Sequence, residues 1–190
     1  MLPHCYPMDL TLYLIHDRFC LTTTSKGGFQ MGLDMYLEAK KYVGQDTYSN
    51  GVSTPNPDYT ALVALAPKGL TDNLQFGGAS VALTVGYWRK ANAIHGWFVN
   101  ELAGGVDECQ GIYVPREKLA ELRELCASVI KQPAMAGDIL PPQEGFFFGS
   151  GEIDEWYLND MQLTIDIIDK VLSAIPEDDY GWSFSYHASW

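Results

Sequence analysis

Two stretches in which apolar and polar residues strictly alternate, residues 33–40 and 182–190, most constrain how this chain can fold. In the first, Leu33, Met35 and Leu37 fall on one side of an extended chain. In the second, aromatic residues and alanine alternate with serine and histidine. A period of two is typical of a strand that buries one face only. The chain must therefore cover one face of a sheet with other elements.

Helical patterns supply that cover. Residues 88–103, a segment that follows Pro115 and ends before Pro133, and residues 152–174 each have apolar residues at helical spacing. With 190 residues, 47% of them hydrophobic, one ordinary domain can bury a core without disulfides or metal. We expect an α+β fold: a single domain with a small mixed or antiparallel sheet covered by about three helices.

The helical patterns also predict which side chains face inward. For residues 88–103, a helical wheel places Trp88, His95 and Phe98 on the inner side and Asn92 and Gly96 on the opposite side. The inner stripe expected for the last helix is Ile153, Trp156, Tyr157, Met161, Thr164, Ile168 and Val171.

Glycine and proline mark the connections. Residues 44–58 are predicted to be a long loop, and residues 44–80 as a whole a loop-rich excursion from the core. Residues 146–148 are predicted to be a short buried strand, which the turn Gly149-Ser150-Gly151 joins to the last helix. The core domain is expected to span residues 31–190.

Residues 1–30 differ in character because they show no clean periodicity. Lys26-Gly27-Gly28 can be encoded by a bacterial ribosome-binding sequence, and Phe29 and Gln30 then form a spacer before Met31. We therefore expect residues 1–30 to be a non-native or disordered extension and translation to start at Met31. An ordinary N-terminal arm is the alternative.

Charge and cysteine usage limit the compartment and the partners. Twelve Lys and Arg against twenty-four Asp and Glu give a formal net charge of −12, which repels phosphate backbones and disfavours general nucleic-acid binding. The four cysteines are scattered without metal-ligand spacing, so we expect no metal site and no disulfide framework. No signal peptide or membrane span is recognisable, and the predicted location is the cytoplasm.

The strand-to-helix corner at residues 86–97 is the densest cluster of candidate site residues. A guanidinium and the amides at a helix N-terminus can converge on an anion there, while aromatic rings supply a stacking wall. This predicts a pocket for a small anionic or nucleotide-like ligand, with core packing and a structural ion pair as the alternative. The candidate ligand-binding residues of this corner are Tyr87, Trp88, Arg89, Asn92 and His95.

A second cluster, FFFGSGEIDEWY, adds Asp154, Glu155 and Trp156 as candidate ligand-binding residues. These carboxylates disfavour a phosphate loop; they could accept hydrogen bonds from Arg89, hold a divalent metal, or simply satisfy the helix dipole. His95 and Glu155 are the candidate catalytic residues. A buried histidine held by a hydrogen bond is the alternative for His95. No cofactor is identified.

The segments MGLDMYL from Met31, YWRKANAIHGWFV from Tyr87 and FFFGSGEIDEWY, with a last strand ending in Ser189-Trp190, resemble a family of small uncharacterised proteins of bacteriophages and prophages. The resemblance covers residues 31–190 except the excursion. It implies a phage accessory protein without assigning an activity. Members of that family lack the thirty-residue extension, in keeping with a start at Met31.

Three functions follow as hypotheses. The first is a phage accessory or counter-defence protein that binds a host protein through its acidic surface or a small nucleotide-like ligand in the aromatic corner. The second is a small enzyme acting on a nucleotide or sugar derivative, with Arg89 binding an anion and His95 with Asp154 or Glu155 exchanging protons. The third is an assembly or structural factor, and the oligomeric state is left open.

Overall fold

The computed structural model describes residues 32–190 except 73–76, 144, 146–147 and 180. The fold is α+β, as the sequence predicts, and Met31–Trp190 forms one compact unit. The expectations for residues 1–30 and for the start at Met31 lie outside the described residues.

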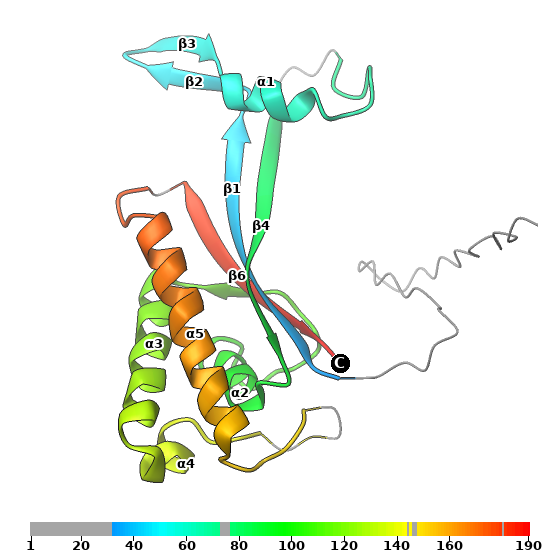
Figure 1. Ribbon diagram of the computed structural model, residues 1–190. Helices are drawn as coiled ribbons and strands as arrows, with labels where there is room; N and C mark the ends of the chain where they lie inside the picture. The colour runs from blue at the N-terminus through cyan, green and yellow to red at the C-terminus, as the bar shows by residue number, and fades with distance from the viewer. Residues whose placement is uncertain (1–31, 73–76, 144, 146–147, 180) are drawn as a thin grey trace, which may run out of the picture. The chain divides into compact units, whose positions relative to one another are not determined.

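The main sheet is antiparallel and has four strands in the order β4-β1-β6-β5 (Figure 1). The two alternating stretches of the sequence become its central strands, β1 (Asp34–Gly44) and β6 (Trp182–Ser189). The outer strands are β4 (Gly78–Arg89) and the short β5 (Ile112–Val114). A bulge interrupts the β1–β4 ladder, where Leu37 pairs with Gly86 and Glu38 with Thr84.

Three longer helices cover one face of this sheet: α2 (Asn92–Leu102), α3 (Arg116–Lys131) and α5 (Glu155–Ala174) (Figure 1). Between α3 and α5 lie the 3-10 turn η1 (Pro133–Met135) and the short α4 (Ala136–Ile139). The core joins the inner residues of the sheet, such as Leu37, to Leu122 of α3 and Ile168 of α5, all fully buried.

The opposite sheet face carries a row of rings. Tyr36 stacks on His187 with ring centroids 4.9 Å apart, and Tyr87 lies 5.3 Å from Tyr36 on the other side. Tyr113 of β5 is 67% exposed on the same face. This face is therefore both aromatic and accessible to water.

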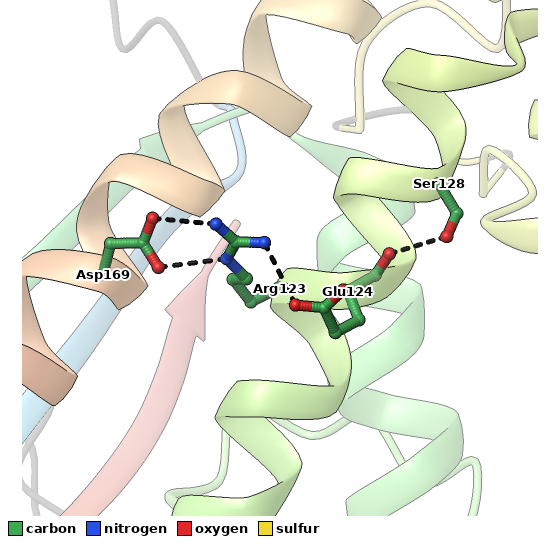
Figure 2. Close-up of polar contacts among 4 residues, drawn as sticks. All are labelled: Arg123, Glu124, Ser128 and Asp169. Carbon is green, nitrogen blue, oxygen red and sulfur yellow. Dashed lines mark hydrogen bonds and ion pairs between the residues drawn. The ribbon is translucent and has the colours of Figure 1, made fainter.

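Polar contacts fasten α5 to α3. The guanidinium of Arg123 donates to both carboxylate oxygens of Asp169 at 3.0 and 3.2 Å and also to Glu124 (Figure 2). Arg116 donates to the carbonyls of Leu172 and Ile175, so it satisfies backbone groups at the C-terminal end of α5. These contacts therefore fix the C-terminal part of α5 against α3.

Residues 44–58 are not the loop that the sequence predicts. They form a hairpin, β2 (Asp46–Ser49) and β3 (Val52–Pro55), whose turn contains Asn50 and Gly51 at positive φ. The helix α1 (Pro57–Val63) follows, capped by the Asn56 side chain. The residues between Pro67 and Asp72 form turns, so the excursion is only partly loop.

The helix predicted from residue 88 begins four residues later. Trp88 and Arg89 still belong to β4, and Lys90, at φ 60°, turns the chain before α2. The expected polar side of this helix is also wrong, because Asn92 and Gly96 are as buried as His95. Gly104 and Gly105, both at positive φ, follow the end of the helix.

The last helix begins at Glu155 rather than Glu152. Two residues of its predicted inner stripe, Ile153 and Trp156, are instead 44% and 78% exposed, whereas the other five are buried. They differ because Ile153 precedes the helix and Trp156 points about 100° away from Tyr157, where the buried stripe begins. Phe146 and Phe147 of the predicted short strand lie outside the described residues, and Phe148 lies in a turn.

Candidate functional site

A cavity of about 280 Å³ lies where β4 passes into α2 beside the start of α5; we call it the β4–α5 cavity. One wall is the corner of residues 89–93 and the other belongs to residues 149–161. The two sequence motifs singled out above therefore meet at one site. The lining residues are Arg89, Lys90, Ala91, Asn92, Ala93, Gly149, Ser150, Glu152, Asp154, Trp156, Tyr157, Asp160 and Met161.

Asn92 ties the two walls together. Its amide nitrogen donates to the carbonyls of Phe148 at 3.2 Å and Ser150 at 2.7 Å, and its oxygen accepts from the backbone N–H of Gln143 at 3.2 Å. These contacts occupy both ends of a 5% exposed side chain. Asn92 lines the cavity, and its hydrogen bonds hold the cavity wall.

The tight corner at Lys90 completes that wall. The Lys90 N–H donates to the Leu33 carbonyl at 2.8 Å, and the Lys90 carbonyl accepts from the N–H of Asn92. Gly149, at φ 92°, packs against this corner, where an added Cβ would lie 3.3 Å from the Cβ of Lys90. Glycine thus allows both the left-handed backbone and the close approach of the two walls.

The opposite wall is the capped start of α5. Asp154 is the N-cap, and its side chain accepts from the N–H of Tyr157 at 2.9 Å. The Tyr157 hydroxyl donates to the Leu140 carbonyl at 2.7 Å and so anchors the first turn. Trp156, in the same turn, leaves its indole largely exposed where it lines the cavity.

The wall formed by residues 89–93 carries the two cations of the cavity, Arg89 and Lys90. Arg89 donates to Asp34 at 3.1 Å, and the Tyr87 hydroxyl donates to the same carboxylate oxygen at 2.6 Å. This hydrogen bond raises the pKa of Tyr87, so its phenol keeps its proton. Within the described part of the chain Lys90 has no ion pair, and its ammonium can take an anion.

Asp160 is the most perturbed acid of the cavity. Burial, with a smaller contribution from the nearby Asp154 carboxylate, raises the pKa of Asp160 from 3.8 to about 6. No described residue donates a hydrogen bond to this carboxyl or forms an ion pair with it. A partly buried carboxyl without a partner inside a cavity is a typical feature of functional sites.

The structure brings four of the eight candidate residues to the cavity: Arg89, Asn92, Asp154 and Trp156. Tyr87 lies on the exposed sheet face, Trp88 is buried in the core, and Glu155 is exposed at the start of α5 outside the cavity lining.

His95 does not line the cavity but belongs to a buried hydrogen-bonded chain. Its Nε2 lies 2.9 Å from a carboxylate oxygen of Asp107, and its Nδ1 lies 2.7 Å from the hydroxyl of Tyr186. A carboxylate can only accept, so Nε2–H donates to Asp107 and Nδ1 accepts from Tyr186. Burial raises the pKa of Tyr186 well above 10, so this hydroxyl has a proton to donate. With the His95 side chain 2% exposed, this arrangement fits the structural alternative.

Comparison with known proteins gives no match. Neither a protein-family model, nor a curated protein, nor a solved structure is similar to this chain. The functional argument therefore rests on the geometry of the site.

The described ranges contain neither a metal-binding cluster nor a membrane-spanning helix. There, no group of three or more His, Cys, Asp or Glu side chains could hold a metal ion, and no helix is long and apolar enough to cross a bilayer. Of the two cysteines in the same ranges, burial raises the pKa of Cys126 to about 12, so that thiol is a poor nucleophile.

Sequence reasoning missed Lys90, Asp160 and several small residues of the cavity lining. Asp160 gave one usable signal, because it directly precedes Met161, which belongs to the buried apolar stripe of an amphipathic helix. A carboxylate beside such a stripe lies at the boundary of the core.

The substitution Asp160→Asn is expected to stabilise the fold at neutral pH. The folded-state pKa lies above the unfolded value, so the charged carboxylate destabilises the native state above about pH 6, and that penalty disappears as the pH falls toward 3.8. Because the carboxyl keeps partial contact with water, we expect a gain of about 1–2 kcal/mol at pH 7 rather than the full value of the shift. Urea unfolding of both proteins between pH 4 and pH 8 measures it, and a difference independent of pH would contradict the assignment.

Proposed function

We propose that this chain is an accessory binding protein of a bacteriophage that takes a small nucleotide-like ligand in the β4–α5 cavity. The observation that carries the proposal is the partly buried carboxyl of Asp160, which has no hydrogen-bond or ion-pair partner among the described residues. The same cavity presents the exposed indole of Trp156 and the ammonium of Lys90, for which no described residue supplies an ion pair. The phage context rests on the sequence resemblance alone.

The cavity offers a complementary group for each part of such a ligand. Lys90 and Arg89 attract an anionic group such as a phosphate. The exposed face of Trp156 suits stacking with a flat ring, an interaction worth about 1–3 kcal/mol per base. Asp160 and Asp154 accept hydrogen bonds from amino or hydroxyl groups. A ligand with an anionic group, a flat ring and hydrogen-bond donors would contact the cations, the indole and the carboxyls of the cavity.

Binding without turnover fits this arrangement better than catalysis. His95, the candidate acid or base, has both ring nitrogens engaged away from the cavity, and Glu155 does not line it. The remaining carboxyls could exchange protons, but no described Ser or Cys nucleophile accompanies them in the lining except Ser150, whose hydroxyl accepts from the N–H of Glu152.

A thermal-shift screen of the full chain tests the proposal with nucleoside monophosphates, cyclic nucleotides and sugar phosphates as probes. A probe that binds only the native state, at a hundred times its dissociation constant, should add about 2.7 kcal/mol to the free energy of unfolding. We expect Lys90→Ala and Trp156→Ala to remove the shift.

Tyr48→Ala serves as the matched control, because Tyr48 is 77% exposed on the hairpin and does not line the cavity. It should leave the shift unchanged. A shift that survives both cavity substitutions would place the ligand elsewhere, and no shift with any probe would reject the nucleotide-like class.

A further inference from the structure

Within the described part of the chain, β4 is an outer strand of the main sheet, and one of its edges is unpaired. Among the described strands it pairs only with β1. Its twelve residues contain no proline, and Arg89, at its last position, is its only charged residue. Soluble proteins commonly shield such an edge with lysine, proline or short length, because unpaired backbone groups recruit another strand.

The free edge is regular over seven residues. The bulge leaves Val85 without a register partner, so the uninterrupted ladder with β1 runs from Gly78 to Thr84. Ala79, Val81 and Leu83 lie on the helix-covered face, opposite Val43, Lys41 and Ala39, and the remaining four residues lie on the other face. Leu83 is nevertheless 49% exposed. A side chain from another strand can therefore pack against Leu83.

We infer that β4 pairs with β4 of a second copy of this chain, antiparallel about a two-fold axis at Val81. In this register Leu83 lies opposite the partner's Ala79, and Val81 lies opposite the partner's Val81. A large side chain beside a small one covers the exposed leucine without crowding. On the other face Ser80 lies opposite the partner's Ala82. The two four-stranded sheets then form one continuous sheet.

The charge distribution along β4 permits a second copy to pair at this edge despite the net charge of the chain. Two chains of net charge −12 repel each other over most of their surfaces. The stretch from Gly78 to Trp88 has no charge, so no like-charged residues oppose each other in the pairing. Nearby acids are already neutralised, because Glu38 pairs with Lys40 and Asp34 with Arg89. A two-fold interface needs such a self-complementary patch.

Light scattering after gel filtration of the full chain, at several micromolar concentrations, tests the inference. We expect a mass of twice 21.1 kDa that falls toward the single-chain value on dilution. A single-chain mass at every concentration would overturn the inference.

The double substitution Ser80→Lys with Ala82→Lys tests the register. Both side chains are exposed, so the monomer should fold, but each new lysine faces a lysine of the partner. Like charges directly opposite each other should weaken the dimer about tenfold. As a control, Leu65→Lys with Leu70→Lys adds the same charge at residues that are 83% and 68% exposed in the excursion and should leave the dimer intact.

Charge reversal makes the test independent of folding defects. The variant Ser80→Glu with Ala82→Glu should weaken the dimer to the same extent, whereas a mixture of the lysine and glutamate variants should form a mixed dimer. Failure of the mixture to associate, with both variants folded by circular dichroism, would overturn the register. None of these residues lines the β4–α5 cavity, so the result is independent of the proposed ligand.

Discussion

Replacing Trp88 by alanine is expected to lower the free energy of unfolding by about 3–5 kcal/mol, the usual range for a large buried aromatic residue. The side chain is 1% exposed and reaches from β4 to α5, where its indole N–H donates to the Thr164 hydroxyl at 2.9 Å. Its ring lies edge-on to Phe98 at 6.3 Å. The substitution leaves both a cavity and a lost hydrogen bond where the sheet meets α5. Urea unfolding followed by circular dichroism measures the loss.

Trp88→Phe is the matched comparison. It keeps most of the apolar volume but loses the donor, so we expect a cost of about 1–2 kcal/mol. Thr164 retains one partner, since its hydroxyl donates to the Asp160 carbonyl at 2.7 Å. If Trp88→Ala lowered stability no more than Trp88→Phe, the packing role assigned to the indole would be wrong.

His95→Leu is expected to destabilise the protein by about 2–3 kcal/mol, because it leaves the buried Tyr186 hydroxyl without its acceptor and Asp107 without its donor. The Tyr186 ring also stacks on Phe98 with centroids 4.0 Å apart, so it cannot easily turn to a new partner. A folded variant of unchanged stability would contradict the structural role of His95.

A double-mutant cycle with Tyr186→Phe separates the hydrogen bond from packing. Tyr186→Phe removes only the hydroxyl and should cost about 1 kcal/mol. In the His95→Leu background the Tyr186 hydroxyl no longer has this hydrogen bond, so Tyr186→Phe should then be neutral or stabilising. Strictly additive effects in chemical denaturation would show that the two side chains do not interact.

The sequence predicts the sheet well because burial alternates along its central strands. Leu33, Met35 and Leu37 are completely buried, and Phe184 and Tyr186 nearly so, as their spacing indicates. The amphipathic helix after Pro115 is confirmed for the same reason, with Leu119 and Leu122 on its covered side. Where one face is covered and the other wet, the pattern of side chains reflects the structure directly.

Hydrophobic periodicity does not predict elements whose residues are all exposed or all buried. The strands of the hairpin, such as Val52–Pro55, are exposed on both faces, so their side chains show no alternation. The helix α2 is buried on nearly every side from Asn92 to Val99, so a wheel with one polar side misrepresents it. In neither element does one side face solvent while the other faces the core, so the sequence shows no alternation of polar and apolar residues.

The site was predictable in its location but not in its chemistry. Arg89 and Trp156 were expected from their motifs, and the cavity joins those motifs. The roles of Asn92 and Asp160 depend on which atoms surround their side chains in the folded protein. Asn92 binds backbone carbonyls beyond the corner, and the pKa of Asp160 depends on burial created by the fold. Spacing along a chain carries no information about such contacts.

The order of the strands in the sheet also sets when this protein can fold during its synthesis. The two central strands come from opposite ends of the described chain, with hydrogen-bonded residues such as Lys40 and Ser183 lying 143 positions apart. A ribosome must therefore release β6 before β1 gains its second neighbour and before β5 gains any. Such distant pairing slows folding. Until β6 emerges, one edge of β1 stays unpaired, and in that interval the nascent chain is most open to chaperones and to aggregation.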